Sequence, residues 1–181
     1  MFHPYDSRHR NETNSRNLRS LNVSFTNGAV SDETISLVAA NCPLLESLNV
    51  NGTMGKVTDE SIKLVAANCQ RLHTLDVAWT YGTITDQSIE CVAINCRHLQ
   101  SLCVSENTKI TDTSMVVVAA HCRWLEWLDV GGTKGITDKS MKMIAMNCPH
   151  LRLLNIAFTS GRITQETLSL LARPQVAVIG A

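Results

Sequence analysis

The chain has 181 residues, 44% of them apolar, and its 16 basic residues balance its 16 acidic ones. This length and apolar content predict one domain with a continuous core, while zero net charge argues against recognition of a nucleic-acid backbone. The longest apolar runs have four to six residues, as in 116–120, which is too short to span a bilayer. We therefore expect neither a nucleic-acid nor a membrane partner.

The first residues and the cysteines indicate the compartment. Residues 1–16 are polar and aperiodic, so they predict a tail or linker stub in front of a domain that covers 17–181. They lack the apolar segment of a secretory signal. Seven cysteines, an odd number, then indicate reduced thiols. The sequence predicts a cytoplasmic or nuclear protein.

One unit recurs from residue 17 onwards. Its leading leucine returns after 27, 27, 27, 26 and 26 residues, at Leu18, Leu45, Leu72, Leu99, Leu125 and Leu151. A constant period in the twenties is typical of a leucine-rich solenoid. In each unit, Leu-x-x-Leu-x-Val/Ile predicts a short strand whose leucines and valine point inward. Such strands must stack in parallel, each crossing over to the next through a helix.

The residues after each strand predict the turn and the start of the helix. A Thr or Asn at a fixed offset is expected to form a ladder of buried hydrogen bonds to the loop backbone of neighbouring repeats, at Thr26, Thr53, Thr80, Asn107, Thr133 and Thr159. An apolar-Ser/Thr-Asp triplet follows in the first five units. Its Ser or Thr can serve as the N-cap, and its Asp suits the positive end of the helix dipole.

The helices show the period expected of a face packed on a sheet. Apolar residues fall at i, i+3, i+4 and i+7, as in Ile62, Val65, Ala66 and Cys69. After the sixth helix, residues 176–181 predict a truncated seventh strand. The expected fold is an α/β leucine-rich-repeat solenoid, a right-handed horseshoe arc of six strand–helix repeats with the parallel sheet on its concave face.

The cysteines are interpreted as structural. Five recur once per unit, at Cys42, Cys69, Cys96, Cys122 and Cys148. Stacked in this way they would lie about 5 Å apart in a line, and not in the tetrahedral cluster of a zinc site, so we expect buried packing. Cys91 is expected in the core. Cys103 is at an outward strand position, where it is either an accessible thiol or an ordinary surface cysteine.

No set of residues suggests catalysis. The six histidines have no spacing that suits a metal site, and no Ser, His and Asp arrangement recurs as a nucleophile with its base. The repeated Asp and Thr are explained by helix capping. We therefore expect no enzymatic activity, no cofactor and no metal.

The outward strand positions and the residues next to them form the candidate binding surface. Trp127 alternates with Leu125 and Leu128, so its side chain should point outward. Aromatic side chains among small polar residues are enriched in protein interfaces. The predicted protein-binding residues are Asp76, Trp79, Tyr81, Trp127, Asp129 and Phe158. For Phe25, Trp79 and Phe158 a second interpretation stays open, in which they cover the rim of the core.

The closing A-N-C of each unit, followed by L-x-x-L-x-V and then I-T-D, resembles the cysteine-containing subclass of leucine-rich repeats over residues 17–172. That subclass is known from F-box/leucine-rich-repeat proteins and from related mitotic-exit and nucleotide-excision-repair proteins. The family often has a second cysteine where this chain has Thr or Asn. The sixteen polar residues at the start cannot hold an F-box.

The resemblance implies a protein–protein interaction module that recognises substrates for an SCF-type ubiquitin ligase, and hence a role in ubiquitin-dependent protein catabolism. It implies a monomer that holds a protein substrate on its concave face, with ligase subunits as further partners if an F-box lies upstream. The alternative is a free-standing scaffold or inhibitor with no link to ubiquitin.

Overall fold

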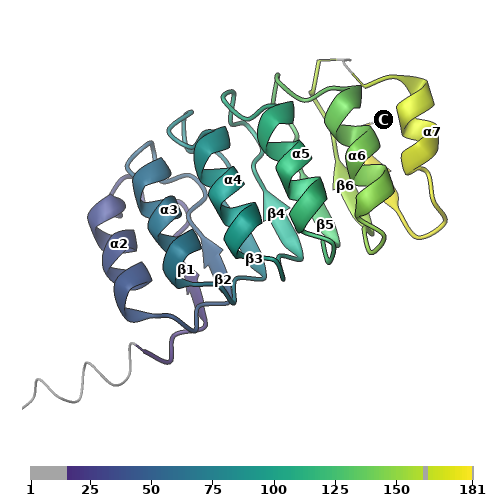
Figure 1. Cartoon of the computed structure of the whole chain (residues 1–181). Coiled ribbons are helices and arrows are strands. Elements are labelled where there is room, and N and C mark those ends of the chain that lie inside the picture. Colours follow the sequence, from purple (N-terminus) through teal and green to yellow (C-terminus); the bar gives the residue numbers. More distant parts are fainter. Residues whose placement is uncertain (1–15, 161–162, 181) are drawn as a thin grey trace, which may run out of the picture.

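The structure, a computed structural model, describes residues 16–160 and 163–180. The predicted tail at 1–16 lies almost wholly outside the described residues, so the domain boundary stays a prediction. Within the described chain, seven three-residue strands form one parallel sheet in sequence order (Figure 1). They are β1 (Ser20–Asn22), β2 (Ser47–Asn49), β3 (Thr74–Asp76), β4 (Ser101–Cys103), β5 (Trp127–Asp129), β6 (Leu153–Asn155) and β7 (Ala177–Ile179).

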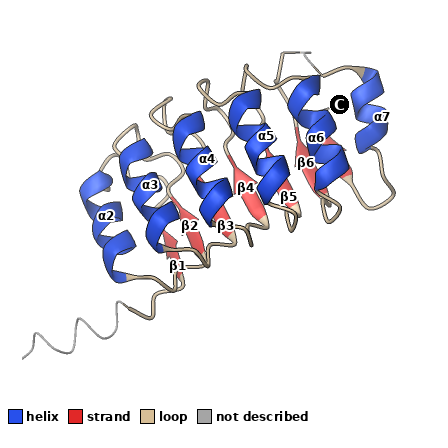
Figure 2. Cartoon of the chain, in the orientation of Figure 1, coloured by secondary structure: helices blue, strands red, loops and turns tan. Residues whose placement is uncertain are grey.

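A helix follows each of the first six strands. These helices are α2 (Asp32–Asn41), α3 (Asp59–Asn68), α4 (Asp86–Asn95), α5 (Asp112–His121), α6 (Asp138–Asn147) and α7 (Gln165–Leu171). All of them lie on one side of the sheet (Figure 2). The axes of packed helices lie about 8–10 Å apart, whereas neighbouring strands lie about 5 Å apart. Because the helix side needs the wider spacing, the solenoid curves and the sheet forms its concave side. The predicted α/β leucine-rich-repeat arc, with its truncated seventh strand, is confirmed.

The strand register aligns the repeats residue by residue. Leu48 at the centre of β2 pairs with Leu21 on one side and Leu75 on the other. Because the register never shifts, each repeat presents the same positions inward. Leu48 and Val50 are fully buried, as is Ile62 on the facing helix. Burying one such side chain stabilises the fold by about 1.5–3 kcal/mol, so a single core runs the length of the sheet.

The polar residue in the turn after the strand is buried in every repeat except the first, where Thr26 is half-buried, but its partner differs from the expectation. The hydroxyls of Thr80, Thr133 and Thr159 donate to the carbonyl three residues earlier in their own repeat, at 3.2, 2.6 and 2.8 Å. Asn107, whose amide is longer, also donates to Val77 of the previous repeat, at 2.7 Å. The Thr80 hydroxyl in turn lies 2.7 Å from Oδ1 of Asn107. The predicted ladder between repeats therefore exists between Thr80 and Asn107, where the longer amide side chain spans the two repeats, while Thr133 and Thr159 bond only within their own repeat.

A different polar row connects the repeats at the start of the helices. The N-cap Thr85 accepts a hydrogen bond from the amide of Gln87, as predicted. Its own amide and hydroxyl donate to the two carboxylate oxygens of Asp59 in the previous repeat, at 2.8 and 2.6 Å. The same pairing of an aspartate with the following N-cap recurs at Asp32, Asp86, Asp112 and Asp138.

Among the described residues, no helix is both long enough and apolar enough to cross a membrane.

Candidate protein-binding surface

The sheet side presents two rows of side chains, because alternate residues of each strand point away from the core. The row at the strand starts has Ser101, Trp127 and Leu153 side by side in the register. Trp127 is half-buried there, and its direction agrees with the alternation. The row at the strand ends has Asp76, Cys103 and Asp129 side by side.

Asp76 and Asp129 hold the ends of their own strands. Oδ1 of Asp76 accepts the amide of Ala78 at 3.0 Å, and Oδ1 of Asp129 accepts the amide of Gly131 at 2.8 Å. This is an Asx-turn, and Asn22, Asn49 and Asn155 form it in the other repeats. Each carboxylate keeps its second oxygen on the sheet side, where it accepts a hydrogen bond from Asn51 or Asn155. Both oxygens of each carboxylate therefore accept a hydrogen bond within the protein, and the outward oxygen has a second lone pair for a partner.

Cys103 is not an accessible thiol, and it is not an ordinary surface cysteine either. Only 5% of the residue is exposed, and its sulfur lies 3.4 Å from the hydroxyl oxygen of Ser105. Burial, together with the negative charges of Asp76 and Asp129, raises the pKa of the Cys103 thiol to about 12. The outward position was correctly predicted, but neighbouring strands cover so small a side chain.

The third residue after each of the first six strands has an unusual backbone. Phe25, Trp79, Glu106 and Phe158 have φ of 53°, 54°, 60° and 62°, in the left-handed region. This region costs an L-residue about 1–2 kcal/mol, and glycine occupies it at the equivalent positions 52 and 132. The side chains are also exposed, by 68% for Phe25, 52% for Trp79 and 84% for Phe158. These exposures favour surface contacts over coverage of the core, and the choice between the two interpretations of these aromatics stays a prediction.

In the loops that follow the strands, side chains of neighbouring repeats lie close to one another. The ring of Phe25 covers Gly52, where a Cβ atom would lie 2.7 Å from Cδ1 of that ring. Trp79, Tyr81 and Glu106 line a shallow hollow of about 140 Å³ at the same edge. Tyr81 is 71% exposed and has a left-handed φ of 57°. Glu106 was not among the predicted residues, although it lies three residues after β4, as Trp79 lies three residues after β3.

The predicted residues fall into three neighbouring groups. Asp76, Trp79 and Tyr81 belong to β3 and its loop, Trp127 and Asp129 to β5, and Phe158 to the loop after β6. From β3 to β6 the sheet extends by about 15 Å at the usual strand spacing. All six side chains belong to the sheet side or to the loops that follow the strands, a surface that one protein partner could cover.

The five periodic cysteines lie in the core, away from this surface. Four are fully buried, and Cys42 is 3% exposed. The thiols of Cys69 and Cys96 lie 3.4 and 3.7 Å from the carbonyl oxygen of the preceding repeat's cysteine. Burial raises the pKa of Cys69 to about 11 and that of Cys96 to about 12. No group of three or more potential metal ligands occurs in the described part of the chain.

Comparison with known proteins agrees with this geometry. The model of the Leucine Rich repeat family matches residues 95–119 and 121–145. The structure of the yeast Rad7 and Elc1 complex contains a chain 21% identical to this one, with a TM-score of 0.60 over 84% of this chain and 44% of that one. An internalin (InlF) from Listeria monocytogenes is also 21% identical, with a TM-score of 0.61 over 93% and 48%. No curated protein matches the chain.

The repeats and the parallel sheet define a leucine-rich-repeat fold, and the family match falls on two of its repeats. At 21% identity the two solved structures show that the fold is shared. The chain spans about half the length of the solved chains it resembles. Leucine-rich repeats imply a role in protein–protein interaction, as does the exposed aromatic edge.

Proposed function

We propose that this protein binds a protein partner through its sheet side and the loops after the strands. Trp79, Tyr81, Trp127 and Phe158 supply the apolar contacts, and the outward oxygens of the two aspartates supply polar ones. The observation that carries the proposal is the row of exposed aromatics in left-handed backbone. Such strain persists where it serves a function, and Trp and Tyr are common binding hot spots.

We further propose that the partner is a substrate of an SCF-type ubiquitin ligase. The resemblance of the A-N-C and I-T-D motifs to F-box/leucine-rich-repeat proteins supports this finer assignment. The similar chain in the Rad7 and Elc1 structure was solved in a complex, which supports partner binding by a chain of this fold. The alternative function is a free-standing scaffold or inhibitor, which would occupy its partner without any ligase.

A comparative pull-down from cytosolic extract tests the proposal. The test variant carries Trp79→Gly, Tyr81→Asn and Trp127→Ser, which are the residues found at the matching positions 52, 27 and 101 of other repeats. It therefore removes the aromatic side chains and keeps the backbone preferences. The control variant carries Leu64→Ser and Met146→Ser, which removes exposed apolar side chains from the helix side.

We expect partners that the control variant retains and the test variant loses. Equal capture by both variants, with both folded by circular dichroism, would place binding elsewhere. Ligase subunits among the captured proteins, together with ubiquitylation of the lost partner in a reconstituted reaction, would support the ubiquitin assignment. A lost partner with no ligase subunit in any capture would favour the scaffold or inhibitor.

A further inference from the structure

The opposite edge of the solenoid, where helices end and strands begin, carries unbalanced positive charge. We call it the helix-end edge, and it consists of the loops 69–73, 96–100, 122–126 and 148–152. These loops contain four arginines and one acidic residue, Glu126, which pairs with Arg152 at 3.5 Å. Arg71, Arg97 and Arg123 are exposed, and none has a carboxylate within ion-pair distance among the described residues.

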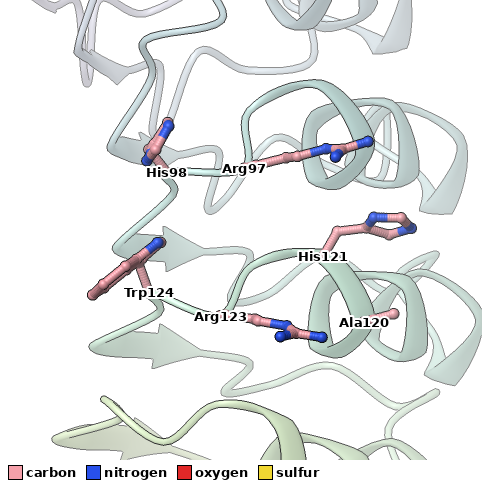
Figure 3. A pocket seen from close by; sticks show the side chains of 6 residues that line it. All are labelled: Arg97, His98, Ala120, His121, Arg123 and Trp124. Atoms are coloured by element: carbon pink, nitrogen blue, oxygen red, sulfur yellow. The ribbon is translucent and has the colours of Figure 1, made fainter.

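Two adjoining hollows form a groove along this edge. The first, of about 400 Å³, is lined by Arg97, His98, Ala120, His121, Arg123 and Trp124. Figure 3 shows Arg97, His121 and Arg123 over the helix ends, with His98 and Trp124 on the strand side. The second hollow, of about 370 Å³, shares Arg97 and His98 and extends to Gln70. The groove therefore crosses three successive repeats.

Contacts within the protein hold several of these side chains in place. The indole of Trp124 stacks on the ring of His150, with centroids 4.8 Å apart and planes 13° apart. Nε of Arg97 donates to the carbonyl of Ile94 at 3.3 Å, which satisfies a helix end. Helix capping therefore accounts for Nε of Arg97, but not for the two terminal nitrogens of its guanidinium group. Arg71 and Arg123 make no such bond in the described part of the chain, and Trp124 stays 51% exposed.

We propose that this groove binds an acidic peptide segment of a protein partner. Its carboxylates would face Arg97 and Arg123, which line the groove and whose planar guanidinium groups match carboxylates with paired hydrogen bonds. Arg71 adds positive charge on the same edge, next to Gln70 at the end of the groove. An apolar side chain between the carboxylates would pack on Trp124. Arginine and tryptophan are the residue types most enriched among binding hot spots. This site lies on the other edge from Trp79 and Tyr81, so it does not depend on the function proposed above.

The observations favour a peptide over a nucleic acid. An extended peptide places alternate side chains about 7 Å apart. This distance falls between the spacing of successive strands, about 5 Å, and that of successive helices, about 8–10 Å, so alternate carboxylates can follow successive repeats. Glu126 on this edge, and Glu46 at the equivalent position directly before β2, would repel a continuous phosphate backbone. The chain as a whole is neutral, whereas nucleic-acid-binding domains are usually strongly basic.

Fluorescence anisotropy with a defined probe tests the proposal. The probe is a labelled twelve-residue peptide in which glutamates alternate with serines around one central tryptophan. A second peptide, in which each glutamate is replaced by glutamine, lacks the negative charge and serves as its control. The test variant is Arg97→Glu with Arg123→Glu. The control is Lys56→Glu with Lys109→Glu, which changes the net charge equally at exposed positions in the loops of the opposite edge.

We expect the arginine variant to weaken binding of the glutamate peptide at least about tenfold, and the lysine variant to change it by less than about twofold. The glutamine peptide should bind about tenfold more weakly than the glutamate peptide, and raising the salt from 50 to 300 mM should weaken binding severalfold. If the reversed variant is unfolded by circular dichroism, Arg97→Gln with Arg123→Gln takes its place.

Three results would overturn the proposal. One is equal binding of the glutamate peptide by the wild type and a folded arginine variant. Another is no binding by the wild type at low salt. The third is tighter binding of a twelve-nucleotide single strand than of the peptide, because it would assign the groove to a nucleic acid.

Discussion

At the scale of the residue, one position in the turn after the strand carries side chains with different roles in different repeats. The third position after the strand is left-handed in every one of the six repeats, yet it holds glycine at 52 and 132, glutamate at 106 and an aromatic at 25, 79 and 158. Glycine adopts this conformation without a steric penalty. An aromatic residue there carries the conformational cost of the left-handed backbone. Phe158, which is 84% exposed, gains little packing in return. This contrast separates residues retained for the fold from those available for binding.

Trp79→Gly should therefore cost little stability. Relief of the left-handed strain, worth about 1–2 kcal/mol, offsets the lost contacts of a half-exposed side chain, so the free energy of unfolding should stay within about 1 kcal/mol of wild type. Leu75→Ala in the same repeat should lower it by about 2–5 kcal/mol, because it leaves a cavity. Urea denaturation measures both. A loss above about 2 kcal/mol for Trp79→Gly would show that the indole belongs to the core.

At the scale of the element, each helix start is joined to the previous repeat by one carboxylate. Asp112 accepts the amide and the hydroxyl of Thr137 and the hydroxyl of Ser140. Burial opposes its ionisation, but the hydrogen bonds from Ser140 and Thr137 outweigh burial and lower its pKa. In α7 the equivalent residue is Gln165, which lacks a carboxylate, and no eighth strand or further helix follows it in the described chain.

Asp112→Asn should lower the free energy of unfolding at pH 7 by about 1–2 kcal/mol, since hydrogen bonds to a charged group are stronger than neutral ones. Glu60→Gln is the matched control, because its exposed carboxylate in the first turn of α3 accepts no hydrogen bond in the described part of the chain. Equal effects of the two changes in urea denaturation would show that loss of charge, and not loss of the pairing between repeats, is responsible.

The same pairing predicts the response to acid. A carboxylate whose pKa is lower in the folded state than in the unfolded state contributes stability above the unfolded value of about 3.9. That contribution disappears as the pH falls through the lower folded pKa. The stability difference between wild type and Asp112→Asn should therefore be constant from pH 7 to about 5 and shrink as the pH falls below 4. A difference that persists at pH 2 would contradict the lowered pKa.

At the scale of the whole molecule, the solenoid buries six of its seven cysteines and leaves Cys91 half-buried. Burial also raises the pKa of Cys122 and Cys148 to about 12. A thiol that stays protonated and covered is a poor nucleophile. The six buried cysteines thus contribute packing and no accessible chemistry. The monomeric state expected from the sequence stays a prediction.

Thiol titration with a disulfide reagent at neutral pH should accordingly show one fast-reacting group in the native protein and all seven in concentrated guanidinium. Cys91→Ser should remove the fast phase, because the other thiols react only through local or global opening. If Cys103 reacted as fast as Cys91, the strands around it would open more readily than their packing indicates.

The sequence by itself determined the repeat, the strand and helix positions, the sheet order and the inward leucines. These features follow from short-range periods of 2, 3.6 and about 27 residues, which are visible in a linear chain. It also identified the exposed Trp79 and Phe158, but it left open whether they cover the core. Only the tertiary structure decided that these aromatics are exposed, that Cys103 is covered, and that Asp59 bonds the next repeat's Thr85. It also brought Arg97, Arg123 and Trp124 into one groove. Side-chain reach and coverage depend on the width and curvature of the stacked repeats, and neither is encoded in the spacing of one repeat.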